Sequence, residues 1–146
     1  MNTEQNKQLV LEGYRKFQSG DIAGLLERFR DDAVWTSPDS EFIPFAGHFH
    51  GKQGIAQFFA KLNANVQATS FSVKELIAEG DKVVAIGDSS WHGHLTGRDY
   101  DLPWVHVFTL RDGMVERVDA YYDTAPPTAA LQALRSAEAD RPDLRQ

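Results

Sequence analysis

The chain has 146 residues, with 21 acidic and 15 basic side chains, a formal charge of −6 and no cysteine. This length fits one domain, and an acidic balance without a basic patch argues against nucleic acid and membrane lipids as partners. The lack of cysteine excludes disulfides, thiolate nucleophiles and cysteine-ligated zinc, while the lack of a long apolar segment predicts a cytoplasmic protein.

Apolar residues at helical spacing predict two helices at the start of the chain. The first stripe, with Asn2 or Thr3 as N-cap, consists of Leu9, Val10, Gly13, Tyr14 and Phe17. The SGD sequence at 19–21 ends this helix, and Asp21 is the expected N-cap of the next. The stripe of the second helix consists of Ile22, Leu25, Leu26 and Phe29.

A short β segment at 33–37 follows, and Pro38 ends it. The stretch 38–51 contains two prolines and two glycines, which predicts a long irregular loop. A third helix is then expected, because apolar side chains recur at helical spacing at Ile55, Phe58, Phe59 and Leu62.

From residue 69 the pattern changes to the alternation typical of strands. The expected strands are 71–78, 82–95, 99–110 and 114–123. Short turns at EGD, TGR and RDG separate them, which predicts an antiparallel meander. The order predicts an α+β fold in which a cone-shaped, curved antiparallel sheet wraps around three N-terminal helices and leaves an aromatic pocket. The domain is expected at 1–126, and the tail at 127–146 as a short helix and a frayed end.

Several stretches of the chain resemble one known family. They are the GD between the first two helices, DDAVW at 31–35, AGHFHGKQGIAQFF at 46–59, WVHVFTLRDG at 104–113 and YYDT at 121–124. In these features the chain resembles the SnoaL-like, ketosteroid-isomerase-related proteins of the nuclear transport factor 2-like superfamily, over roughly residues 5–125. The resemblance implies a cystatin-like cone, and the group includes isomerases, dehydratases, cyclases, epoxide hydrolases and non-catalytic binding domains.

The resemblance also implies roles for three residues. In the steroid isomerases of this superfamily the general base is an aspartate just before the proline that ends the first strand, and Ser37 stands at this position here. Tyr14 matches a tyrosine that donates to the oxyanion, and His106 matches a protonated aspartate that provides the second donor. Because the base is replaced by Ser37, the steroid isomerase reaction is not expected.

His106 interrupts an apolar strand, where it shares a face with Trp104 and Phe108. It is either a satisfied core histidine or a neutral imidazole of lowered pKa that acts as acid, base or hydrogen-bond donor in the pocket. If RDG is a three-residue loop, His106 faces Val118; if DG is a two-residue turn, it faces Asp119, which would raise its pKa. We favour the first arrangement because it exposes Asp119.

The other histidines form two pairs, His48 with His50 and His92 with His94, with the spacing that places both rings on one strand face. No suitably spaced acidic ligand follows the first pair, so we expect no metal site. Asp88 is expected to face solvent. The residues expected to contact a substrate, besides the catalytic candidates Tyr14 and His106, are Trp35, Ser37, Phe58, Trp91, Trp104, Phe108, Val118 and Tyr122.

These features predict a cofactor-independent acid–base enzyme of the isomerase, cyclase or dehydratase type that acts on a hydrophobic, oxygenated small molecule. The alternatives are a non-catalytic small-molecule binding domain and a protein-interaction module. We also expect a homodimer formed through the outer face of the sheet, where Val84, Ile86, Val105 and Val107 would form an apolar patch.

Overall fold

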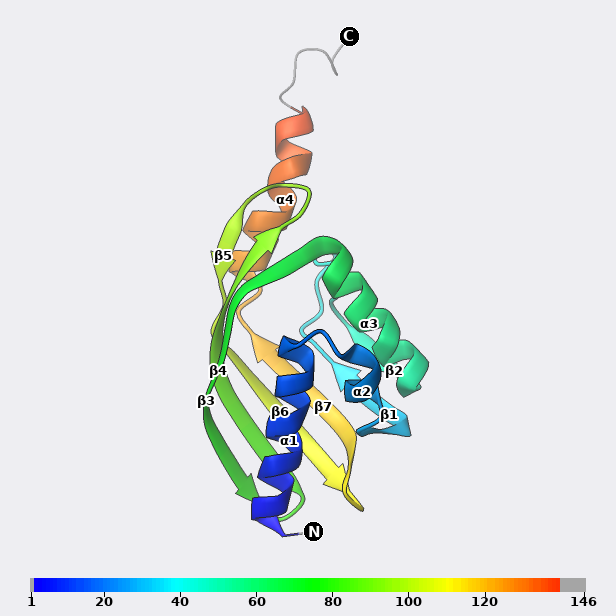
Figure 1. The fold of residues 1–146 in the computed structure, drawn as a ribbon. Helices are drawn as coiled ribbons and strands as arrows, with labels where there is room; N and C mark the ends of the chain where they lie inside the picture. The colour runs from blue at the N-terminus through cyan, green and yellow to red at the C-terminus, as the bar shows by residue number, and fades with distance from the viewer. Residues whose placement is uncertain (1, 140–146) are drawn as a thin grey trace.

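A computed structural model of the protein describes residues 2–139 (Figure 1). The helices are α1 (Thr3–Gln18), α2 (Ile22–Leu26), α3 (Gly51–Asn65) and α4 (Ala125–Ala139). The strands are β1 (Phe29–Thr36), β2 (His48–His50), β3 (Val66–Glu79), β4 (Lys82–Gly93), β5 (Asp99–Asp101), β6 (Trp104–Arg111) and β7 (Met114–Tyr122). In this part of the chain no helix is long and apolar enough to cross a membrane.

Side-chain caps fix the starts of the first two helices. The Asn2 side chain accepts a hydrogen bond from the Gln5 backbone, and the Gln5 side chain binds back to the Asn2 backbone, which completes a capping box. The Asp21 side chain accepts from the Gly24 backbone at the start of α2. Of the two candidates for the N-cap of α1, Asn2 is the residue that caps the helix, and Asp21 caps α2. Both predicted caps are therefore confirmed.

All but one of the strands lie in the order β2-β1-β7-β6-β4-β3, and β5 pairs with β4 beside this path. Strands β3, β4, β6 and β7 form the expected antiparallel meander. Strand β1, however, runs parallel to β7, so the sheet is mixed and the prediction of a wholly antiparallel sheet is wrong at this pair. The α+β fold with a curved, unclosed sheet is confirmed.

Several element boundaries differ from those predicted. Strand β3 follows α3 without a break, and β2 forms within the loop predicted as irregular by pairing with β1. The expected strand 99–110 is divided at Leu102 and Pro103, between β5 and β6, because Pro103 lacks the N–H that a continuous ladder requires. Helix α4 begins at Ala125 and packs on the fold through the buried Pro127 and Ala130. The frayed end predicted for the last part of the tail at 127–146 lies almost wholly outside the described residues.

The turn between β6 and β7 combines two features. Asp112 and Gly113 both have positive φ, 52° and 76°. They form a two-residue turn that is flanked by the paired residues Arg111 and Met114. A bulge then shifts the register after the pair Leu110 and Val115, so His106 lies opposite Ala120. Both predicted partners, Val118 and Asp119, are therefore wrong. The predicted inward face of β7 is nevertheless kept, since the bulge restores the alternation.

Helices α1, α2 and α3 cover the concave face of the sheet, whereas α4 lies beside β5 at its end (Figure 1). Helix α1 packs against β3 and α3 packs against β1, and side chains from both fill most of the space above the sheet. The fully buried positions include Phe29, Ile55, Val83 and Val118. These contacts fix α1 opposite the inner face of β6, which places Tyr14 over His106.

Candidate functional site

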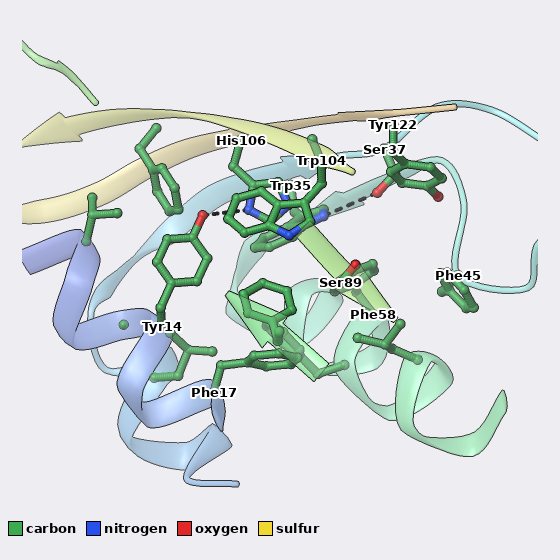
Figure 2. A pocket seen from close by; sticks show the side chains of 18 of the residues that line it. Tyr14, Phe17, Trp35, Ser37, Phe45, Phe58, Ser89, Trp104, His106 and Tyr122 are labelled. Carbon is green, nitrogen blue, oxygen red and sulfur yellow. Dashed lines mark hydrogen bonds between the residues drawn. The ribbon is translucent and has the colours of Figure 1, made fainter. Parts of the chain in front are cut away.

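A cavity of about 110 Å³ lies between α1, α3 and the concave face of the sheet (Figure 2). Its walls are almost entirely apolar and aromatic. None of its lining residues is an aspartate or glutamate. Arg28 is the one fully charged side chain that lines it, and its guanidinium pairs with the Glu12 carboxylate at 3.0 Å. The interior therefore suits an uncharged, largely apolar molecule.

The structure brings together nearly all residues predicted for the site. The cavity is lined by both catalytic candidates and by Trp35, Ser37, Phe58, Trp91, Trp104, Phe108 and Tyr122. Val118 does not line it, because its side chain is wholly buried in the core opposite Phe108. Further residues that were not predicted from the sequence also line the cavity, among them Phe17, Phe71, Ser89, Tyr100 and Leu102. Alternation along β4 and β5 is the signal that could have indicated the last three.

The Tyr14 hydroxyl and His106 Nδ1 are 2.7 Å apart and share a hydrogen bond (Figure 2). We assign the hydroxyl as donor, because a phenol is a stronger acid than a neutral imidazole. In this tautomer Nδ1 accepts, and the single ring proton of the neutral imidazole is on Nε2, for which no hydrogen-bond partner is found among the described residues. The Tyr14 hydroxyl thus orients the ring and leaves one N–H for a ligand.

Aromatic rings surround the His106 imidazole. The ring stacks on Trp104 with 4.4 Å between centroids, and Trp35 and Phe108 contact it edge-on. Burial lowers the pKa of His106 to about 3, since no described acidic group offsets the loss of hydration. Burial also raises the pKa of Tyr14 well above its usual value. Both groups are therefore uncharged at neutral pH.

Two tryptophan–serine pairs line the cavity beyond this hydrogen bond. Trp35 Nε1 donates to Ser37 Oγ at 3.3 Å, and Trp91 Nε1 donates to Ser89 Oγ at 2.8 Å. The Ser89 hydroxyl in turn donates to the Leu102 carbonyl at 2.8 Å. Each serine lies two residues from its tryptophan, so the two side chains share one face of the strand. Ser37, which stands where the resemblance to the steroid isomerases implies a base, therefore serves as a hydrogen-bond acceptor for Trp35.

Asp119 does not face His106 but lies on the other face of the sheet. Its carboxylate accepts from Thr36 Oγ1 at 2.6 Å and from Arg117 Nε at 3.0 Å. Partial burial acts to raise the pKa of Asp119, but the hydrogen bonds from Arg117 and Thr36 outweigh it, and the pKa is lowered. The carboxylate is therefore ionised at neutral pH and remote from the cavity.

The remaining polar candidates lie on the surface. His92 Nδ1 is 2.6 Å from the Asp99 carboxylate, and His94 Nε2 donates to the Asn63 carbonyl at 3.1 Å. His48 and His50 are exposed on one face of β2. Within residues 2–139 no group of three or more histidines and acidic side chains could hold a metal ion. Asp88 is partly exposed and forms an ion pair with Lys74.

The fold and the aromatic cavity define a nuclear transport factor 2-like protein. The sequence profile of the SnoaL-like domain matches residues 10–118, and the chain therefore belongs to the SnoaL-like family. No curated protein matches the chain.

Solved structures agree with this assignment. A nuclear transport factor 2-like protein from Burkholderia xenovorans LB400 is 27% identical, with a TM-score of 0.81 over 90% of this chain and 98% of its own. A nuclear transport factor 2-like protein of unknown function from Burkholderia pseudomallei K96243 is 26% identical, with a TM-score of 0.83 over 91% and 100% of the two chains. TerC, co-crystallised with polyporic acid, is 28% identical, with a TM-score of 0.79 over 88% and 98% of the two chains.

Proposed function

We propose that the protein binds a hydrophobic, oxygen-bearing small molecule in the cavity and acts on it as a cofactor-independent acid–base enzyme of the isomerase, cyclase or dehydratase type. The observation that carries this proposal is the Tyr14–His106 hydrogen bond within otherwise apolar walls. A ligand oxygen beside His106 would take the place of solvent at Nε2. The apolar walls would select the carbon skeleton, and the imidazole would select an oxygen atom.

The chemistry follows from the protonation states. A neutral His106 donates its Nε2 proton as a hydrogen bond to the ligand oxygen, and the Tyr14 hydroxyl holds the Nδ1 side. Negative charge that develops on this oxygen is stabilised strongly, because little water screens it inside the cavity. Both nitrogens of His106 are engaged in this arrangement, Nδ1 by the Tyr14 hydroxyl and Nε2 by the ligand oxygen, so His106 acts as the hydrogen-bond donor and the proton that leaves the ligand passes to water.

A relative supports a small-molecule ligand. TerC has nearly the same fold over almost its full length, and its crystal contains polyporic acid. Polyporic acid is therefore a suitable first probe for the cavity. Because the chain has no cysteine, electrophilic probes cannot be consumed by thiol addition.

A second candidate function is a binding domain without catalysis. It is favoured by Ser37 and by the absence of any carboxylate among the lining residues, since proton removal from carbon normally uses such a base. In this alternative the Tyr14–His106 pair anchors a ligand oxygen and no proton is transferred.

The test combines binding and proton exchange. Polyporic acid and acetophenone are titrated into the protein while tryptophan fluorescence is followed. The double substitution Tyr14→Phe with His106→Phe removes both partners of the hydrogen bond together. Stability should then change little, whereas either single substitution strands a buried polar group and costs about 1–3 kcal/mol. The double variant should bind at least one of the probes roughly tenfold more weakly, and the exposed His92→Gln control should bind as the wild type does.

Deuterium exchange separates the two candidates. An acid–base enzyme should accelerate exchange of the acetophenone methyl protons in D₂O, as followed by proton NMR, and the double variant should not. Saturable binding with exchange at the buffer rate would favour the binding domain. Equal affinity of the wild type and the double variant for both probes would contradict both candidates.

A further inference from the structure

The indole N–H of Trp104 is a buried donor without a partner. Trp104 is 4% exposed and lines the cavity, yet its Nε1 has no hydrogen-bond acceptor among the described residues. Figure 2 shows the indole lying across the cavity beside His106. A buried donor that is left unsatisfied costs free energy, so a natural protein retains few of them and each one needs a reason.

A second unpartnered donor lies on the neighbouring strand. Tyr122 is directly opposite Trp104 in the β6–β7 register, and its hydroxyl is also buried without a described partner. Both side chains line the cavity, and Tyr122 lies on the side away from Tyr14 (Figure 2). Burial raises the pKa of Tyr122 to about 12, so its hydroxyl keeps its proton at neutral pH.

The other two tryptophans show that the fold can satisfy such a donor. Trp35 donates to the serine two residues after it, and Trp91 donates to the serine two residues before it. The residue two positions after Trp104 is His106, whose Nδ1 is already bonded to Tyr14. Besides His106 Nε2, the Trp104 indole N–H and the Tyr122 hydroxyl are therefore further donors in the cavity wall that no described residue accepts.

We propose that Trp104 Nε1 and the Tyr122 hydroxyl form a second hydrogen-bonding site, in which each can donate to an acceptor oxygen of the ligand. This inference rests on the proposed function, because it assigns the Tyr14–His106 pair to a first ligand oxygen. The ligand is then an apolar molecule with two oxygen functions, such as a diketone, a hydroxyketone or a quinone.

The charges around the cavity restrict which chemical group can carry the second ligand oxygen. Both donors are uncharged, and the Arg28 guanidinium is engaged by Glu12. A carboxylate buried at the second site would lack a cation to offset its lost hydration. The second oxygen is accordingly a neutral acceptor, such as a carbonyl.

The experiment compares ligands that carry one or two carbonyl groups. Acetophenone, 1,3-diacetylbenzene and 1,4-diacetylbenzene are titrated into the full chain by calorimetry. The better of the two diketones should bind the wild type roughly tenfold more tightly than acetophenone, because it gains the second site. Trp104→Phe and Tyr122→Phe should each reduce this ratio, and together they should bring it below about twofold, with the acetophenone affinity of each variant as its own reference.

Trp91→Phe is the matched control. It removes an indole from the same cavity, but one whose N–H is already bonded to Ser89, so the diketone ratio should be kept. An independent readout is the indole N–H spectrum of the ¹⁵N-labelled protein, which has three tryptophans. The signal that Trp104→Phe removes should move downfield with the diketone and not with acetophenone.

The outcomes separate the two proposals. Acetophenone binding that depends on Tyr14 and His106, with no diketone advantage and no shift of the Trp104 signal, overturns the second site alone. Failure of all three probes to bind saturably contradicts the proposed function and the second site together. A diketone advantage that survives in the Trp104→Phe, Tyr122→Phe double variant also overturns the second site.

Discussion

His106 is held neutral by its surroundings and oriented by one hydrogen bond. Trp35, Trp104 and Phe108 exclude water around the ring, and Tyr14 binds one of its two nitrogens. Because no carboxylate lies beside it, the charged form has no compensation in the folded state. The same environment that makes His106 a strong hydrogen-bond donor to a ligand therefore makes the fold sensitive to acid.

The pH dependence of stability follows from this lowered pKa. The folded-state pKa of about 3 lies below the unfolded value of about 6.5, so between these values the unfolded chain binds the extra proton. The contribution of the neutral His106 ring to the free energy of unfolding is fully present above pH 6.5 and is lost as the pH falls toward the folded-state pKa. At pH 5 the loss from this one group amounts to about 2 kcal/mol.

Urea unfolding at pH 7.5 and pH 5 measures this loss. The free energy of unfolding should decrease by about 2 kcal/mol more for the wild type than for the Tyr14→Phe, His106→Phe double variant. Equal decreases for the wild type and the double variant would mean that His106 titrates as an ordinary exposed group.

At the scale of elements, β6 and β7 show what the sequence could and could not predict. The alternation of β6 placed Trp104, His106 and Phe108 on one face, and the structure has them there. The bulge after Leu110 and Val115 was not predictable, because it depends on the pairing of both strands and not on either sequence alone. The predicted cross-strand partner of His106 was therefore wrong, although the predicted face of the sheet was right.

The site was predictable to a similar extent. Helical spacing brings Tyr14 to the buried face of α1, and the family resemblance connects it with His106 across 92 residues. Tyr100 was missed because β5 is only three residues long and reaches the cavity through its pairing with β4. The unpartnered Trp104 N–H could not be predicted from the sequence, because only the three-dimensional structure shows which donors lack acceptors.

Gly87 in β4 supports the position of Trp104. A β-carbon at Gly87 would lie 2.7 Å from Trp104 Cε2, and it would also meet Trp104 Cζ2 and the Ser72 carbonyl oxygen. Gly87→Ala should therefore displace the indole or separate β3 from β4, which lowers the free energy of unfolding by about 1–3 kcal/mol. It should also weaken diketone binding.

The matched control for Gly87→Ala lies in α1. A β-carbon at Gly13 would meet Leu25 at 3.4 Å, an ordinary contact, and alanine favours the helix by about 1 kcal/mol. Gly13→Ala should therefore raise the stability measured by urea unfolding. A neutral or stabilising effect of Gly87→Ala would contradict the close approach of Trp104 to the strand.

At the scale of the whole molecule, the two faces of the sheet differ. The concave face carries the helices and the cavity, whereas the described helices leave the outer face largely uncovered (Figure 1). Two adjacent rows of apolar side chains cross this outer face in register. One row contains Ile77, Val84 and Val107, and the other contains Ile86, Val105 and Tyr121. Ile77 and Tyr121 are 49% and 56% exposed.

We expect this outer patch to form a homodimer. An apolar surface that spans four strands is costly to leave in water, and a second copy offers the same patch to a twofold interface. Sedimentation velocity at micromolar concentration should give twice the chain mass of 16.4 kDa. Val107→Glu places a charge in the centre of the patch and should yield a monomer, whereas Gln53→Glu adds the same charge on the exposed side of α3 and should leave the dimer intact. A wild-type chain that sediments as a monomer would contradict the dimer, while ligand binding in the cavity would be unaffected, since no residue of the patch lines it.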